Sequence, residues 1–266
     1  MIFEYEFMRK AFLVGILLAV VMSCIGLIVV LKRLSMIGNA LSHTSLAGVA
    51  FGLIFNINPV LGAVIACIIA SFSIEIVRKK IPKYSEMSIA IITSAGIGLA
   101  GILSGFVKNA ATFNSFLFGS IVAISDFEVV MVVGISILVL AAFTLLYKEL
   151  FLITFDENTA NLSGVPVKTV NFIFTILTAV TVSVAARTVG ALIVSSMMVV
   201  PVSCAMQFGK SYKQTLFYSI AFAVSFTIVG LLAAYYLGLK PGSTIVIVGV
   251  ITLALLFIAR SKFKNN

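Results

Sequence analysis

Charge is scarce in this chain, and so are the side chains that most often build catalytic and metal centres. Only 10% of its 266 residues are charged and 61% are hydrophobic, whereas soluble globular proteins have about 25% charged and about 45–50% apolar residues. A single histidine excludes most metalloenzyme sites. The three cysteines, Cys24, Cys67 and Cys204, lie far apart in different apolar runs. They offer no disulfide framework or paired metal ligands and are expected to be small buried residues.

The chain also lacks a polar stretch long enough for a separate soluble domain. Apolar runs of about 20 residues, the length that crosses a bilayer, recur from end to end. The first run ends in Lys32 and Arg33 without a small-residue cleavage site, so we expect a membrane span there and not a signal peptide. The sequence therefore predicts one all-α transmembrane domain, residues 1–266, with eight to nine spans. The candidate spans are 11–31, 36–55, 59–77, 86–106, 127–147, 169–186, 188–206, 214–237 and 243–260.

The net charge of +9 could indicate nucleic-acid binding, but the basic residues form short clusters between apolar runs. That distribution is typical of a protein oriented in membrane lipid, so no nucleic-acid partner is expected. Cytoplasmic loops carry the excess of Lys and Arg. This rule predicts the N-terminus outside and the C-terminus inside, because only five of the eighteen basic residues then lie outside. The five are Arg9, Lys10, Lys108, Arg187 and Lys240, and the thirteen inside include Lys32, Arg33, Arg78, Lys79, Lys80 and Lys83.

Two pairs of glycines have the spacing that lets helices approach closely in lipid. Gly48 and Gly52 form one GxxxG pair, and Gly101 and Gly105 form the other. Packing within the chain is the favoured interpretation, and a dimer contact is the alternative.

The only histidine lies within the second predicted span. If that segment is helical, His43 lies about 15 Å beyond Arg33, close to the midplane of a hydrocarbon core about 30 Å thick. Asn39 precedes His43 by four residues, so both side chains share one helix face. Polar groups at this depth generally face a bundle interior or a water-filled path. The alternative is that His43 only hydrogen-bonds a neighbouring helix.

One histidine and one asparagine cannot close a tight metal site, since structural zinc usually takes four N or S ligands. If two copies of the chain paired about a two-fold axis, two histidines and two asparagines would converge. Such a partial ligand set suits a path from which an ion must move on.

Residues 148–168, "KELFLITFDENTANLSGVPVK", form a long polar connection that the charge rule places inside. Its Asp-Glu-Asn-Thr-Ala could begin a short helix that Gly164 and Pro166 end, although a surface loop without a partner is an open alternative. The Gly-Lys-Ser of residues 209–211 is not a P-loop, because Cys204 occupies the position of the first glycine and no strand precedes it. Any ATP-driven work therefore needs another subunit.

Four stretches together resemble one family. They are "LSMIGNALSHTSLAGVAFG", "FLFGSIVAIS", "LITFDENTANLSGVPV" and "GALIVSSMMVVPVSCAMQFGKSYK". The chain resembles the membrane subunit of bacterial metal-ion importers of the ABC type 3 permease family, which carry zinc, manganese or iron.

The resemblance implies a fold like that of the vitamin B12 importer, a homodimer in the bacterial cytoplasmic membrane, two ATP-binding subunits and an extracellular solute-binding protein. It implies that Asp156, Glu157, Ala160 and Gly164 couple the chain to the ATPase. It also implies that Asn39 and His43 line the metal path, with Asn39 replacing the usual Asp of the family. No permanently bound cofactor is expected, only the transported divalent ion.

Zinc is the cargo that the resemblance favours, because the whole chain looks most similar to zinc permeases of Gram-positive type. An amide at Asn39 attracts hard cations less than a carboxylate does, so we expect weaker metal binding, with a smaller effect on zinc, which accepts imidazole readily. The same machine for manganese or iron is the first alternative. A secondary transporter is a further one, although it would need ionisable residues deep in several spans. A membrane scaffold without transport would leave Asn39 and His43 unexplained.

Overall fold

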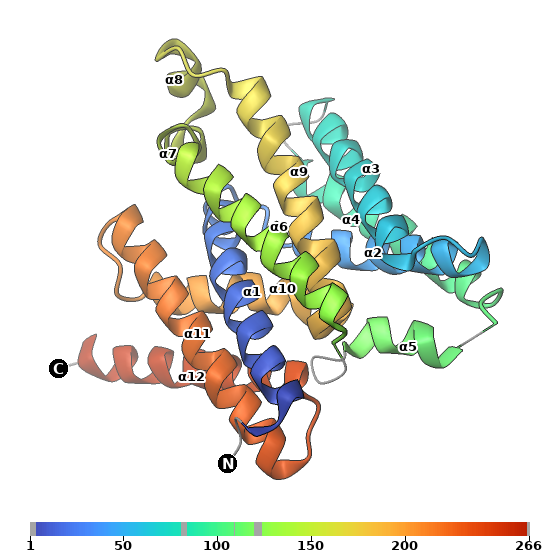
Figure 1. Cartoon of the computed structure of the whole chain (residues 1–266). Coiled ribbons are helices and arrows are strands. Elements are labelled where there is room, and N and C mark those ends of the chain that lie inside the picture. Colours follow the sequence, from blue (N-terminus) through green and yellow to red (C-terminus); the bar gives the residue numbers. More distant parts are fainter. Residues whose placement is uncertain (1–3, 81–83, 109, 120–123, 265–266) are drawn as a thin grey trace.

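The computed structural model describes residues 4–80, 84–108, 110–119 and 124–264, and every regular element within them is a helix (Figure 1). Lys83 and residues 120–123 of the second matching stretch lie outside the described residues. The helices are α1 (Glu6–Leu31), α2 (Ile37–Ile54), α3 (Pro59–Lys80), α4 (Ser85–Ser104), α5 (Ala110–Phe118), α6 (Asp126–Leu145), α7 (Tyr147–Phe155), α8 (Glu157–Leu162), α9 (Val167–Ala185), the π-helical turn η4 (Ala186–Gly190), α10 (Ala191–Ala205), α11 (Tyr212–Leu237) and α12 (Pro241–Lys264).

Eight helices in the described part of the chain are long and apolar enough to cross a membrane. Because every backbone polar group in hydrocarbon must be satisfied within the protein, helices are the structure that such apolar runs adopt. This confirms the all-α, multi-pass prediction. The predicted span 188–206 is the exception in length, since α10 has only 15 residues and contains Pro201. The nine-residue helix α5 was not predicted, because its segment is too short to show a clear period.

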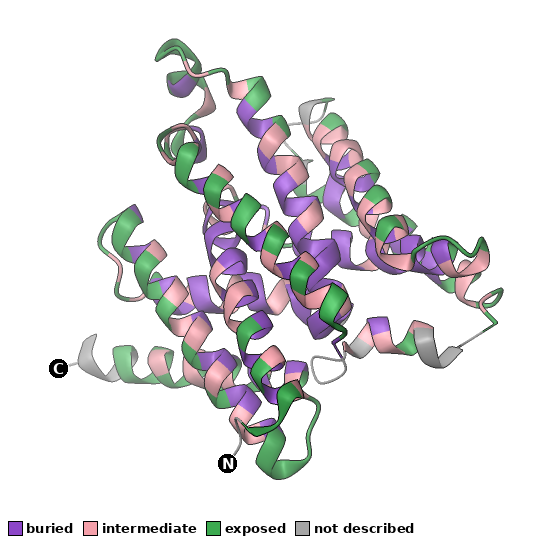
Figure 2. Cartoon of the chain, in the orientation of Figure 1, coloured by how far each residue is buried: buried purple, intermediate pink, exposed green. Residues whose placement is uncertain are grey.

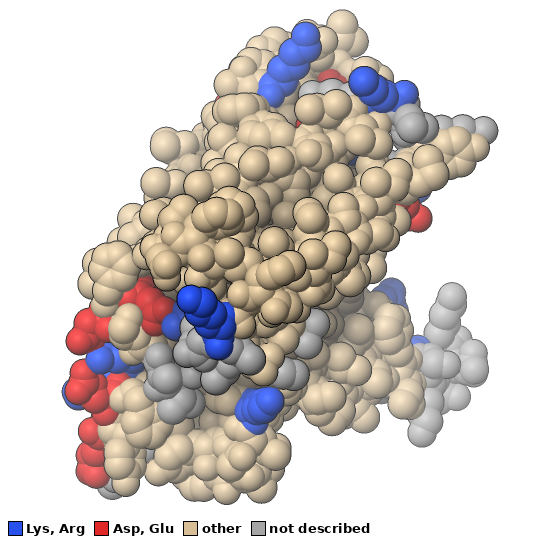
Figure 3. Space-filling model, turned by 90° about the vertical axis from the view of Figure 1, so that its right-hand side faces the viewer, with Lys and Arg blue, Asp and Glu red and all other residues tan. Residues whose placement is uncertain are grey.

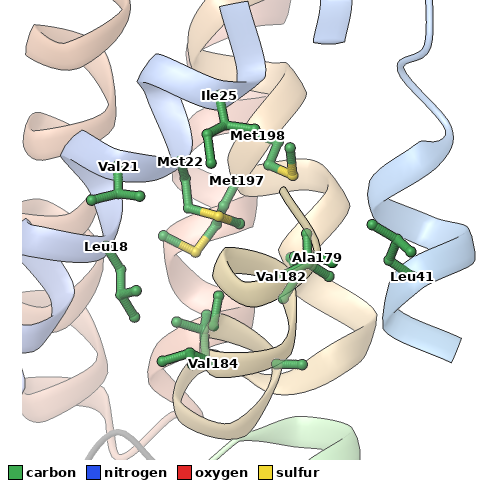
Figure 4. Close-up of a cluster of buried hydrophobic side chains, with 14 of the residues drawn as sticks. Leu18, Val21, Met22, Ile25, Leu41, Ala179, Val182, Val184, Met197 and Met198 are labelled. Carbon is green, nitrogen blue, oxygen red and sulfur yellow. The ribbon is translucent and has the colours of Figure 1, made fainter. Parts of the chain in front are cut away.

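Three spans form the centre of the molecule. In an 18-residue apolar stretch of α1, of α2 and of the span over α9 and η4, 67–72% of residues are buried, against 22–33% in the corresponding stretches of α3, α4, α6, α11 and α12. Figure 2 shows this as mainly buried ribbon in the middle and exposed ribbon at the periphery. Side chains from α1, α9 and α10 interdigitate in the core drawn in Figure 4, where Met22 and Met197 lie close together. The three cysteines are buried and unbridged, as predicted.

The boundary between α9 and α10 differs from the predicted break near residue 187. The chain continues through η4 and turns at Gly190, whose φ of 108° lies in the region that favours glycine. Gly119 (φ 72°) packs against the backbone of Val189 there, and any side chain at Gly119 would collide with it. Arg187, predicted in a loop, lies in η4. Its Nε donates a hydrogen bond to Glu128 at 2.7 Å, and its guanidinium lies over the ring of Phe116.

Ion pairs show which helix ends lie together. Lys32, Arg78 and Glu157 meet at one end of the bundle, named here the α8 end. Lys10 pairs with Asp126, and Arg187 with Glu128, at the other end, named the α5 end. In Figure 1 the α8 end is at the top and the N-terminus is at the bottom. On the face drawn in Figure 3, charged residues lie toward the two ends, and a broad uncharged band separates them.

The two glycine pairs have different environments. A Cβ on Gly48 would collide with the carbonyl oxygen of Gly62 on α3, and one on Gly52 would lie 2.9 Å from Cα of Pro59. The first pair therefore lets α2 and α3 pack backbone to backbone, as small residues do in membranes. Gly101 on α4 and Gly105, the residue that follows α4, are exposed, and a Cβ on Gly101 would meet nothing within 4 Å. The first pair therefore lies at a contact within the chain, whereas the second pair meets no other helix of the described chain.

We expect Gly48→Val to lower the stability of the protein by about 1–3 kcal/mol, because the new side chain forces α2 away from α3. Thermal unfolding in detergent measures this effect. Gly101→Val is the matched control, since open space surrounds that position. An equal loss of stability in the two variants would contradict the assignment of the α2–α3 contact.

Candidate functional site

Asn39 and His43 lie one turn apart near the beginning of α2. Both are half-buried, while Ala40, Leu41 and Ser42 between them are buried. The hydroxyls of Ser42 and Thr44 donate to carbonyl oxygens of their own helix, at 2.7 and 2.9 Å. Among the described residues, neither the Asn39 amide nor the His43 imidazole has such a partner. The structure therefore leaves the ligand atoms of this pair free, which does not support the alternative of a helix-to-helix hydrogen bond.

Three neighbouring helices fix the position of this pair. A Cβ on Gly96 of α4 would lie 2.8 Å from Oγ1 of Thr44 and 3.3 Å from the carbonyl carbon of His43, so α4 lies directly against the backbone there. On another side, Gly38 packs on Ser195 and Met198 of α10. The Cys67 thiol of α3 donates to the carbonyl oxygen of Leu41 at 3.3 Å. Because small residues let three backbones approach, α2 has little freedom to rotate.

One chain does not close a metal site at this position. Within the described residues, no group of three or more His, Cys, Asp or Glu side chains could hold a metal ion. An apolar groove of about 640 Å³ runs between α2, α3 and α4, and its lining includes Thr44 but neither Asn39 nor His43. The polar pair therefore lies outside the groove and offers one nitrogen and one amide oxygen, too few for a resident ion.

The second predicted feature, residues 148–168, contains two short helices. Asp156 is the N-cap of α8, where its carboxylate accepts from the Asn158 backbone N–H at 2.9 Å and from the Thr159 hydroxyl at 2.5 Å. The bond from Thr159, with help from the Asn158 N–H, holds the pKa of the exposed Asp156 carboxyl below its ordinary value. Gly164, with φ 81°, follows the helix end. The predicted short helix is thus present, with the predicted residues at its two ends.

Glu157 lies at the junction of α8 with the transmembrane bundle. Its Oε1 is 3.0 Å from Nζ of Lys32 and 3.7 Å from the Arg78 guanidinium, and it accepts from Nδ2 of Asn171 at 3.2 Å. Burial lowers the pKa of the Lys32 ammonium, and the Glu157 charge only partly offsets that effect. Burial alone would raise the pKa of Glu157, but Lys32 and Arg78 outweigh it, so that pKa lies below its ordinary value. Lys32 and Glu157 form an ion pair with Nζ and Oε1 3.0 Å apart, in which each group compensates the charge of the other.

The four residues expected to couple the chain to an ATPase do not share one exposed face. Ala160 is fully buried and Glu157 points toward the bundle. Besides Asp156, the exposed side chains of this segment include Leu162, which is 89% exposed, and Phe155, which is 64% exposed, together with Asn158 and Asn161. Sequence reasoning missed these residues. An isolated leucine in a polar loop was the available signal.

Aromatic rings hold α7 against α11. Tyr212 has ring contacts with Tyr147 at 5.6 Å, with Phe151 at 5.1 Å and with Phe155 at 6.4 Å. Ser211, the last residue of the Gly-Lys-Ser stretch, is the N-cap of α11, because its hydroxyl accepts from the Gln214 N–H at 3.3 Å. The Gly-Lys-Ser stretch is therefore a helix start, in agreement with the rejection of a P-loop.

A family model described as the ABC 3 transport family matches residues 4–261. The chain belongs to the ABC 3 transport family. This confirms the resemblance drawn from the four stretches, and the chain is a membrane permease of the ABC class.

Several curated relatives match this permease over almost their full length. It is 32% identical to the "Probable metal transport system membrane protein" of Treponema pallidum, covering 95% of each chain. It is 30% identical to the manganese transport system membrane protein MntC of Listeria monocytogenes, covering 97% of this permease and 92% of MntC. It is 26% identical to the high-affinity zinc uptake system membrane protein ZnuB of Haemophilus influenzae, covering 91% and 94%.

A solved structure has the same architecture. The permease matches a chain of PsaBC from Streptococcus pneumoniae in complex with Fab, with a TM-score of 0.86 and 26% identity, over 96% of this permease and 92% of that chain. The expected importer-type permease fold is confirmed.

We expect Asp156→Ala to loosen α8, because the first turn loses its capping oxygen and the partner of Thr159. Backbone hydrogen exchange over residues 157–162 should become several-fold faster, whereas Asn161→Ala should leave it unchanged. Since the folded pKa of Asp156 is depressed, the protection is present above the ordinary carboxyl value of 3.8 and is lost as the pH falls through the folded pKa. Unchanged exchange in Asp156→Ala would reject the cap.

Proposed function

We propose that this permease imports a divalent transition-metal ion past Asn39 and His43, on a path between two copies of the chain. The observation that supports this most directly is a half-exposed imidazole and amide on one face of α2, with no protein partner among the described residues. Imidazole nitrogen binds first-row metals, and a second copy would double the ligand set. The names of relatives that transport metal, manganese or zinc support the same class of cargo.

Zinc is the cargo that the residues favour. The described acidic residues near the bundle, such as Glu75, Asp126 and Glu157, lie toward the helix ends and not beside His43. A site of imidazole and amide groups suits zinc better than manganese, which prefers carboxylate oxygens. Manganese is the second candidate, since several relatives are named for it, and iron would use the same path.

The basic residues support a direction for import. Lys32, Arg33, Arg78 and Lys80 lie at the α8 end, so the positive-inside rule places that end in the bacterial cytoplasm. An odd number of crossings, with α10 as the ninth, puts the N-terminus outside and the C-terminus inside. Metal delivered by a solute-binding protein would then enter at the α5 end and leave at the α8 end.

Residues 148–168 are the coupling segment to the ATP-binding subunit in this proposal. A groove of about 620 Å³ separates α8 from the start of α9, and its lining includes Asn158, Asn161 and Lys168. With exposed Leu162 beside it, this surface presents an apolar contact and amide groups toward the cytoplasm. Asp156 and Gly164 shape the segment, and Ala160 packs it on the bundle. ATP hydrolysis belongs to the partner chain, and this chain is not an enzyme.

We expect His43→Ala to reduce zinc import to background, because the path loses the nitrogen ligand from each copy. The measurement is uptake of radioactive zinc into proteoliposomes that contain the permease, its ATPase and its binding protein. Thr44→Val is the matched control, since the neighbouring hydroxyl bonds only within α2. Normal uptake by His43→Ala would reject the role of His43 in the path.

We expect Asn39→Asp to raise manganese uptake relative to zinc uptake on the order of tenfold, because a carboxylate adds charge and hard oxygen ligands. Competition between the two metals in the same vesicles measures the ratio. A manganese preference in the unmodified permease, unchanged by Asn39→Asp, would overturn the assignment of zinc.

A further inference from the structure

We propose that Lys32, with Glu157 and Asn171, is a positioning residue that transmits movement of α8 to the helix that carries Asn39 and His43. The inference rests on the proposed function. It assigns the transmission of movement from α8 to α2 to an ionic contact inside the protein, and not to the surface that meets the ATPase. The family resemblance implies that Glu157 contributes to the ATPase contact, whereas in the structure its carboxylate points inward to Lys32.

One carboxylate oxygen joins α8 to three transmembrane elements. Oε1 of Glu157 faces Lys32 after α1, Arg78 on α3 and Asn171 on α9, at 3.0, 3.7 and 3.2 Å. Lys32 also donates to Oδ1 of Asn171 at 2.8 Å, so ammonium, carboxylate and amide form a closed triangle. Glu157 is the first residue of α8, and any displacement of that helix moves this oxygen.

The Lys32 side chain is almost fully buried, which makes its contact with Glu157 hard to break. It is only 7% exposed, so its charge has little water to replace Glu157 if the two separate. A buried ammonium without its counterion is strongly unfavourable. The ammonium therefore has to follow the carboxylate or lose its main partner. The pair of Lys10 and Asp126 differs, because Asp126 is 85% exposed. Water can solvate both charges of an exposed pair when they separate, so neither side chain has to follow the other.

A short and rigid turn connects Lys32 to α2. Helix α1 ends in a Schellman motif: the Arg33 N–H donates to Val30 at 3.0 Å, and the Leu34 N–H donates to Val29 at 2.8 Å. Arg33 takes the left-handed conformation that this motif requires, with φ 59°. The Ile37 N–H then donates to Leu34 at 2.8 Å, so the hydrogen bonds continue into the first residue of α2.

The distance from this turn to the metal-path residues is short. Asn39 lies two residues beyond Ile37, and His43 lies about 9 Å along the helix axis from it. Leu34 and Ile37 are each 7% exposed and seat the turn in the core. A shift at Lys32 therefore reaches Asn39 and His43 through hydrogen-bonded backbone alone, without an intervening flexible loop.

The test compares coupling with assembly in Glu157→Gln and Lys32→Met. Each variant is co-purified with its ATPase, reconstituted with the binding protein, and measured for zinc imported and ATP hydrolysed. We expect the complex to form and ATP hydrolysis to stay within about twofold of the unmodified complex, while zinc imported per ATP falls at least tenfold. Glu86→Gln, an exposed carboxylate in the first turn of α4, is the matched control and should keep the normal ratio.

A merely structural role would give a different result, because misfolded complexes lose import and hydrolysis in proportion. An unchanged ratio of zinc to ATP in both variants would therefore overturn the inference. If the unmodified complex imports no metal at all, that result rejects the proposed import function. If the unmodified complex imports zinc and both variants keep its zinc-to-ATP ratio, only the role of Lys32 and Glu157 is rejected.

The double variant Lys32→Met/Glu157→Gln covers the case in which a single change prevents folding. It removes both charges together, so no unpaired buried charge remains. We expect it to assemble and to stay uncoupled. Normal coupling in this variant, or loss of the assembled complex, would contradict a role in movement.

Discussion

Gly48 on α2 and Gly62 on α3 bring two helix backbones so close that no side chain fits between them. The free energy of association between helices in lipid comes from such close packing, since hydrocarbon tails are as apolar as leucine. With α4 close at Gly96 and α10 close at Gly38, the same device recurs on each side of α2. These contacts fix the rotation of α2 about its own axis, and with it the direction in which Asn39 and His43 face within the apolar bundle. A side chain at any of these glycines would turn or tilt the helix that presents Asn39 and His43.

The two ends of the bundle use charge in different ways. At the α5 end, Lys10, Asp126, Arg187 and Glu128 join α1, α6 and η4, and the Asp126 partner is largely solvated. At the α8 end, Lys32 is almost fully buried. When Glu157 moves, the Lys32 ammonium therefore moves with it, because little water is present to replace the carboxylate. Between the ends, the uncharged band confines ionic interactions to positions where helices enter and leave the membrane. Movement of a partner at the α8 end can therefore reach α2 through an ionic contact that water does not replace.

Much of the fold could be predicted from the sequence because apolar length is a strong signal. Eight of the predicted spans appear as long helices, and the short helix at Asp156 has its predicted ends. The sequence could not show that α9 continues through a π turn to Gly190, or that α5 exists, since both depend on packing between distant segments. GxxxG spacing alone did not distinguish Gly48, which meets α3, from Gly101, which meets nothing. The candidate pair on α2 was visible from spacing, whereas the inward direction of Glu157 required the position of Lys32.

In the proposed import path, His43 residues from two copies of the chain bind the transported ion together. X-ray absorption spectroscopy of zinc bound to the purified permease measures this shared coordination. We expect one zinc for two chains, with imidazole nitrogen and oxygen ligands at about 2.0–2.2 Å and two histidines in the shell. Sulfur ligands at about 2.3 Å, or one zinc bound fully by each chain, would rule out shared binding by the two histidines.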